Sequence, residues 1–208
     1  MRNPLNAFVI LAALSVGSVA LVQEHERKAD PAVELRMTLR KLWEDHITYT
    51  RNYIISALAN LPDAEAVLNR LMKNQEDLGN GIKPYYGSEA GDSLTRLLKD
   101  HIKVAGDVVK AAAANDKERL KAEQKRWSEN GREIAALLSG ANPKWPRKTL
   151  EDMMQKHLDL TTEEAAARIK KDWAADIKAY DAGHEHMLMF ADALADGIVQ
   201  QFPAKFSR

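Results

Sequence analysis

Apolar residues recur every three to four positions over most of the chain after residue 32, which is the pattern of amphipathic helices. Prolines, glycines and asparagines interrupt the pattern at intervals and mark where helices end. The spacing predicts helices over residues 33–61, 62–82, 89–114 and 116–139. We expect the segment 83–87, Lys-Pro-Tyr-Tyr-Gly, to separate the second helix from the third.

The last quarter of the chain carries two capping-box sequences, at 149–152 and 161–164. They predict a short helix through Leu158 and a new helix start at Thr162. No proline follows until Pro203, so we expect a closing helix about 60 Å long. Short connections favour antiparallel neighbours. The sequence therefore predicts an all-α, elongated up-and-down bundle of five to six helices with a long C-terminal helix, in one domain over 33–208.

The N-terminal segment has a different composition. Arg2 precedes an uncharged, mostly apolar stretch over 7–22, and Ala20 follows Ser-Val, which suits a signal peptidase. We expect residues 1–22 to be a signal peptide or N-terminal anchor and residues 23–32 to be a polar tether. The protein is therefore expected to be exported, to the periplasm or the cell exterior, with membrane contact only through an uncleaved N-terminal segment.

Charge and cysteine content narrow the possible partners. Lys+Arg and Asp+Glu both count 30, so the formal net charge is zero and nucleic acid is not an expected partner. The chain has no cysteine, which excludes disulfides, thiolate metal sites and a thiol nucleophile. Any metal must be held by nitrogen and oxygen ligands.

Polar residues interrupt the apolar stripes near the midpoints of the expected helices, and antiparallel helices of similar length align their midpoints. The interruptions are His46, Gln75, His101 and His184, with Asp176 one turn before Tyr180 on the last helix. We expect the first four to converge in one buried polar layer, to which the fourth helix contributes Trp127 and Asn130. His186, two positions after His184, is expected on the surface because the two side chains point about 200° apart on a helix.

Three imidazoles with a carboxylate or amide suit zinc, copper or iron. The predicted metal ligands are His46, His101, His184 and Asp176, and Gln75 is an alternative to the carboxylate. If the ligand is another small molecule, the predicted contacts are Gln75, Trp127, Asn130 and Tyr180. The other interpretation is that these groups hydrogen-bond one another, fix the helix register, and leave the bundle with a purely structural or interaction role.

Sequence motifs of common enzyme classes are missing. The chain has no phosphate-binding glycine loop, no Gly-x-Ser-x-Gly elbow and no Glu-x-x-His motif of di-iron bundles. The pattern favours a binding protein over an enzyme. A metal-assisted hydrolase or transferase remains the second alternative.

Several short motifs together resemble a known type of protein. They are Trp43-x-Asp-His, Asn74-Gln-x-Asp, the segment 82–87, Arg126-Trp-x-x-Asn, His157-Leu-x-Leu-Thr-Thr, Tyr180-Asp-x-x-His and Leu194-Ala-Asp-Gly-Ile. These residues resemble an uncharacterised family of exported bacterial all-helical proteins, over nearly all of the chain after the N-terminal segment. Members carry labels such as acetylglutamate kinase or glycosyltransferase. The resemblance implies an exported helical protein and supplies no catalytic residues.

Overall fold

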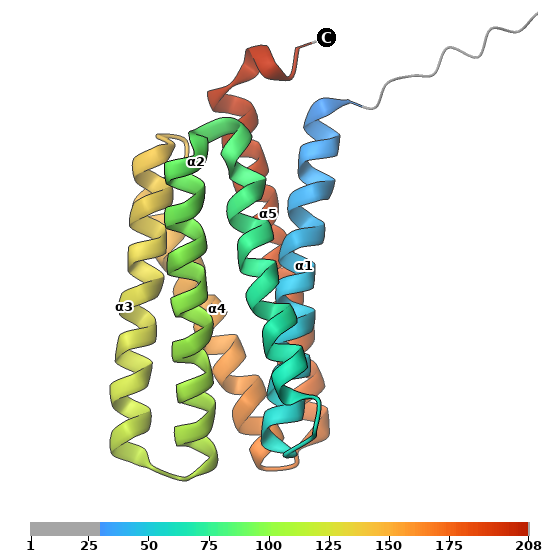
Figure 1. The fold of residues 1–208 in the computed structure, drawn as a ribbon, viewed down its shortest axis with the longest axis vertical. Coiled ribbons are helices and arrows are strands. Elements are labelled where there is room, and N and C mark those ends of the chain that lie inside the picture. The colour runs from blue at the N-terminus through green and yellow to red at the C-terminus, as the bar shows by residue number, and fades with distance from the viewer. Residues whose placement is uncertain (1–29, 208) are drawn as a thin grey trace, which may run out of the picture.

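The computed structural model describes residues 30–207, which form five α-helices, one short 3-10 helix and no strand (Figure 1). The helices are α1 (Pro31–Leu58), α2 (Ala64–Ala113), α3 (Lys117–Ala141), α4 (Arg147–Ile169) and α5 (Trp173–Gln201), and η1 (Pro203–Lys205) follows them. The predicted all-α, elongated up-and-down bundle with a long C-terminal helix is therefore confirmed for the described part. The predicted signal or anchor segment 1–22 lies outside the described residues.

Helix α2 is folded back on itself, so the bundle has six helical rods (Figure 1). Its two arms, 64–86 and 88–113, meet at Gly87, whose φ of 81° and ψ of 172° are not helical. A positive φ of this size is accessible to glycine at little cost. The predicted interruption is thus present, but Pro84 lies inside the first arm and the break comes at the end of the predicted segment.

The two arms of α2 come into close contact at Gly79 and Gly91. A Cβ on Gly79 would lie 1.9 Å from Oγ1 of Thr95 and 2.5 Å from the carbonyl oxygen of Gly91. Neither distance is compatible with a side chain. The absence of a Cβ at this position is what lets the first arm lie so near the second.

The C-terminal part differs from the prediction in two places. Helix α4 continues through the expected break, because Oγ1 of Thr161 donates to the carbonyl of His157 (2.9 Å) within the helix rather than capping a new one. The chain then turns at Lys171, which has a φ of 60°, and Asp172 caps α5 by accepting from the amide of Ala175 (3.1 Å). The single closing helix of about 60 Å was therefore wrong; the 29 residues of α5 span about 44 Å.

The first helix begins slightly earlier than predicted. Asp30 accepts from the amide of Ala32 (2.9 Å), and Pro31 occupies the first turn, where its missing N–H costs nothing. The last two residues of the predicted tether thus belong to α1. From this start α1 packs between the first arm of α2 and α5 (Figure 1). Its Trp43 contacts Phe190 edge to face, with ring centroids 5.1 Å apart, in the middle of the main core.

No helix among residues 30–207 combines the length and apolar character that a membrane crossing requires.

Candidate functional site

Three histidines from three helices meet in the interior. His46 of α1, His101 of α2 and His157 of α4 are each at most 2% exposed. The ring centroids of His46 and His157 are 5.6 Å apart, and those of His101 and His157 are 5.8 Å apart. We call these three residues, with Gln75, Trp127 and Asn130, the histidine layer. It lies at mid-bundle because each histidine is near the middle of its helix or arm.

His101 has both ring nitrogens engaged. Its Nδ1 lies 2.7 Å from Oδ1 of Asn130, and its Nε2 accepts from the indole N–H of Trp127 (3.1 Å). Since Nε2 is an acceptor here, the proton of the neutral ring is on Nδ1, which donates to Asn130. The Asn130 amide in turn donates to the carbonyl of Leu97 (3.0 Å). No lone pair of His101 is left for a further ligand.

Other polar atoms at or beside this level are buried without a hydrogen-bond partner among the described residues. They are Nδ1 of His46, Nδ1 of His157, Oε1 of Gln75 and Oγ1 of Thr50. The Gln75 amide nitrogen, by contrast, donates to the carbonyl of Leu71 (2.7 Å). A buried polar atom without a partner costs about 1–3 kcal/mol. Unlike His101, His46 and His157 therefore each have an Nδ1 without a hydrogen-bond partner.

Burial keeps all three imidazoles neutral. Desolvation lowers the pKa of His46 to about 3, with a contribution from His101, while the nearby Gln75 amide opposes the shift without completing a hydrogen bond. Desolvation lowers the pKa of His101 to about 4, although Asn130 favours the charged form. The pKa of His157 falls well below 6.5 through burial and the neighbouring histidines. Neutral imidazole is the form that accepts hydrogen bonds and binds metals.

The structure does not bring His184 into this layer. It is 29% exposed and faces Glu44, with 3.3 Å between its Nε2 and the carboxylate. His186, expected on the surface, is buried instead, and its Nε2 lies 2.8 Å from the carbonyl of Met153. The reason is the turn at 170–172, which restarts the helix and changes the face that α5 presents to the core. His157, missed in the sequence, takes the place expected for His184.

Asp176 belongs to a separate group of charged residues between α1, α4 and α5. The group consists of Arg51, Glu164, Arg168 and Asp176 and is here called the charge cluster. Asp176 binds Arg51 and Arg168, each at 2.9 Å. Burial alone would raise the pKa of Asp176, but these two cations hold it below its ordinary value. Tyr180 lies under the Arg51 guanidinium at 4.6 Å. Asp176 is therefore paired with arginines, away from the histidines.

Glu164 is the unusual member of the charge cluster. Its carboxylate is 2.7 Å from Arg51 and only 5% of the residue is exposed. Burial raises its pKa to about 7, against the opposing effect of Arg51. The cluster joins the C-terminal half of α4 to α1 and α5.

Of the predicted site residues, the structure thus brings together His46, Gln75, His101, Trp127 and Asn130, and separates them from His184, Asp176 and Tyr180. Within residues 30–207, no three histidine or carboxylate side chains are grouped as a metal site requires. The predicted four-ligand set is therefore not assembled. The remaining candidate metal ligands are the imidazoles of His46 and His157, together with an amide or hydroxyl oxygen.

A small apolar cavity of about 20 Å³ lies beside the histidine layer. Trp127 belongs to both, since its ring lines the cavity while its N–H reaches His101. The other lining residues are Thr50, Tyr53, Ile54, Leu71, Ile102, Ala105, Val108, Val109, Thr161, Thr162 and Ala165. The volume accommodates one water-sized group.

An open groove of about 190 Å³ adjoins the cavity between α2, α3 and α4, and it is here called the α4 groove. The two share Val108, Val109, Thr162 and Ala165. The other lining residues of the α4 groove are Ala112, Asn115, Lys117, Leu120, Gln124, Ala166, Ile169 and Lys170. The groove and the cavity are therefore neighbours along α4, and Trp127 lines only the cavity.

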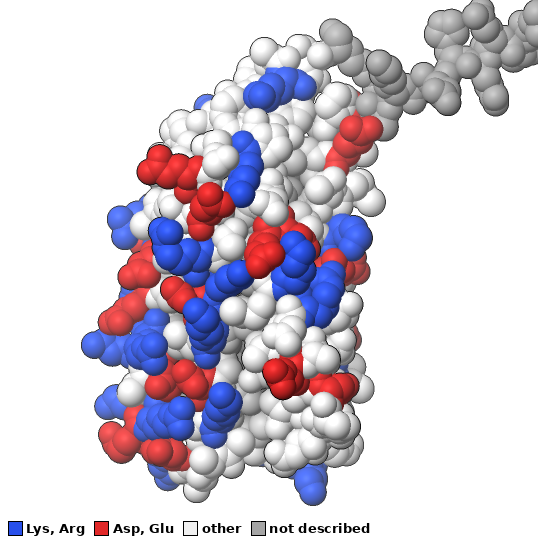
Figure 2. All heavy atoms as spheres, in the orientation of Figure 1, with Lys and Arg blue, Asp and Glu red and all other residues white. Residues whose placement is uncertain are grey.

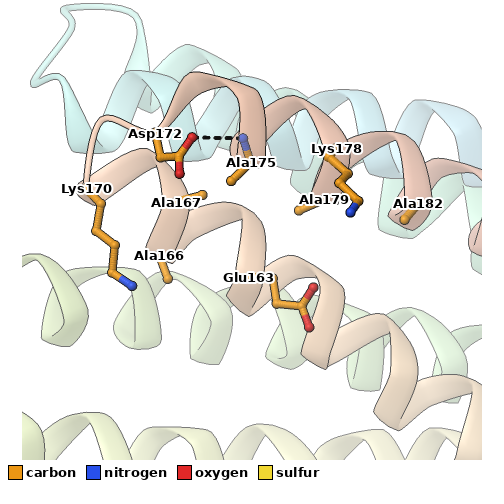
Figure 3. A pocket seen from close by; sticks show the side chains of 9 residues that line it. All are labelled: Glu163, Ala166, Ala167, Lys170, Asp172, Ala175, Lys178, Ala179 and Ala182. Carbon is orange, nitrogen blue, oxygen red and sulfur yellow. Dashed lines mark hydrogen bonds between the residues drawn. The ribbon is translucent and has the colours of Figure 1, made fainter.

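A second groove, of about 400 Å³, lies between α4 and α5 (Figure 3). Figure 3 shows alanines of both helices facing it, with Glu163, Lys170, Asp172 and Lys178 around them. It is wide and open, and both charge signs occur on its rim. It does not reach the histidine layer.

Comparison of the chain with protein-family models, with curated proteins and with solved structures gives no match. The geometry and chemistry of the described residues are therefore the basis for assigning a function.

Proposed function

We propose that the chain is an extracytoplasmic binding protein that holds a small, mainly apolar ligand in the α4 groove and the adjoining cavity, next to the histidine layer. The observation that carries the proposal is that an open, mostly apolar groove adjoins a buried apolar cavity lined by Trp127, with four lining residues in common. Binding sites for small molecules are concave and mostly apolar, with few polar groups, and bundles build them between facing helices. The α4 groove and its cavity have these properties.

Thr50 lines the cavity, and its hydroxyl is buried without a partner among the described residues. The histidine layer closes the inner end of the binding site. It holds the Trp127 ring in place, because the indole N–H of Trp127 donates to Nε2 of His101.

The test is a titration with the neutral fluorescent probe N-phenyl-1-naphthylamine. We expect saturable binding of about one probe per chain. Ala112→Phe places a ring in the groove from a half-buried position and should abolish the signal. Ala113→Phe, one residue on and exposed outside the groove, is the matched control and should bind as wild type does. Equal binding by both variants, or none by the wild type, contradicts the proposal.

A transition-metal ion, zinc, copper or iron, is the second candidate ligand. It is favoured by the free Nδ1 atoms of His46 and His157, both kept neutral by burial. Elemental analysis of protein purified without a His-tag, with thermal melts in each metal, tests it. Near-stoichiometric metal and a rise in Tm that His157→Gln removes and His184→Gln leaves intact would support it. Absence of both would leave the histidines structural.

A further inference from the structure

Resting on the proposed binding function, we infer that the ligand is a single-chain amphiphile with an anionic head group. Its head lies between Lys117 and Lys170 at the mouth of the α4 groove, and its chain runs inward to Trp127. The charge of the groove, its shape and its apolar lining each support this class of ligand.

The charge of the lining is one-sided. Lys117 and Lys170 are its only charged residues, and no aspartate or glutamate belongs to it. Among the described residues neither lysine has an ion pair or a side-chain hydrogen bond, and both are exposed. Elsewhere the surface mixes the signs: Figure 2 shows lysines and arginines interspersed with carboxylates over the face it presents.

The two acidic neighbours of Lys117 in sequence, Asp116 and Glu118, do not line the groove. Asp116 caps α3, where it accepts from the amide of Arg119 (3.1 Å). Lys117 is the first residue of α3, and the positive end of a helix adds to the attraction for an anion.

The shape of the groove limits the tail to one chain of moderate length. From Lys117 to Trp127 is ten residues of α3, about 15 Å. From Lys170 to Thr161 is nine residues, about 14 Å along α4. These lengths match a medium-length saturated acyl chain in extended form. The inner cavity, at about 20 Å³, has room only for the chain end and excludes a second chain.

The lining explains why the tail is an alkyl chain. Along most of the path the wall consists of Val108, Val109, Leu120, Ala165 and Ile169. Ile169 is 38% exposed, and a bound chain would cover it.

The experiment compares decanoate with decanol, which has the same chain length and no charge. Both are titrated by displacement of N-phenyl-1-naphthylamine, without detergent and at low salt. We expect decanoate to bind more tightly than decanol, and Lys117→Gln/Lys170→Gln to weaken decanoate about tenfold while leaving decanol unchanged. Lys121→Gln, which removes an exposed, unpaired cation of α3 outside the groove, should leave both affinities unchanged.

Decyl phosphate and decyl phosphocholine extend the comparison to other head groups. Binding of decanoate and decyl phosphate alike indicates recognition of negative charge, whereas a preference for decanoate identifies a free fatty acid. Preference for the zwitterionic phosphocholine overturns the inference.

Three further outcomes would overturn it. They are equal affinities for decanoate and decanol, no effect of the double lysine variant, and no displacement by either compound. If the neutral probe still binds and Ala112→Phe still abolishes it, the proposed binding function stands and only the ligand class is wrong. If the probe does not bind either, both fail together.

Discussion

The buried histidines should make the fold sensitive to acid. Burial holds the pKa of His46 near 3 and that of His101 near 4, and lowers that of His157 well below the ordinary 6.5. Below about pH 6.5 the unfolded chain binds protons at these imidazoles and the folded chain does not. The free energy of unfolding should therefore fall as the pH drops through 6.5 toward 4, and these groups should have no effect above that range.

The size of the effect follows from the pKa values. One pKa unit corresponds to about 1.4 kcal/mol, so at pH 5 His46 and His101 each remove about 2 kcal/mol relative to pH 8, and His157 acts in the same direction. Glu164 acts in the opposite direction: its folded pKa of about 7 exceeds the ordinary 4.5, so it adds stability as the pH falls. Its contribution at pH 5 is about 2.5 kcal/mol. His46, His101 and Glu164 together leave a net loss of about 1.5 kcal/mol, which His157 increases, against the 5–15 kcal/mol typical of a domain.

Urea unfolding followed by circular dichroism at pH 5, 6, 7 and 8 measures this loss. His157→Leu removes one buried imidazole whose pKa is lowered by burial and whose Nδ1 has no partner, so the loss of stability between pH 8 and pH 5 should become smaller. His184→Gln removes a partly exposed imidazole outside the layer and should retain the wild-type dependence. A wild-type stability that stays flat from pH 8 to pH 5, or an unchanged dependence in His157→Leu, would refute the reasoning.

Three other substitutions test the packing. Gly79→Ala should destabilise the fold by about 1–3 kcal/mol in urea unfolding, because the added Cβ has no room, whereas Gly140→Ala should stabilise it by about 0.5–1 kcal/mol, because that helical position faces open space. Stability changes of the same sign in the two variants would contradict the close approach of the two α2 arms. Arg51→Met should cost about 3 kcal/mol by leaving Glu164 without its counter-ion, and adding Glu164→Gln should recover part of it, as a double-mutant cycle would show. Asp172→Ala should cost about 1 kcal/mol in thermal melts by removing the cap of α5, and no change would mean that the cap is not needed.

The sequence predicted the bundle because its strongest signal, the three-and-four spacing of apolar residues, is set by the same core that holds the helices together. It predicted the reversal near residue 87 from Pro84 and Gly87, although it placed the break too early, since a proline within a helix removes one hydrogen bond without always ending the helix. The turn at 170–172 carried no comparable signal. Lys171 adopts a positive φ without being glycine or asparagine, and only tertiary packing specifies that.

The same misplaced boundary explains the errors in the site. Thr161 was interpreted as a cap, which ended the expected helix just after His157 and hid that residue's position on a core-facing stripe. The spacing of Leu150, Met154, His157 and Thr161 is the signal that could have found it. His46, Gln75 and His101 were predicted correctly as members of one layer because their own helices have clear ends. The α4 groove was not predictable, since a gap between helices depends on how far they diverge.

The pairing of α1 with α5 determines when this chain can finish folding during synthesis. Trp43 of α1 packs on Phe190, and Arg40 binds Asp192, 152 positions later in the chain. The side of α1 that faces α5 therefore has no native partner until almost the whole polypeptide has been translated. Until then this apolar side of α1 stays exposed, and incompletely folded chains with exposed apolar surface are prone to aggregate.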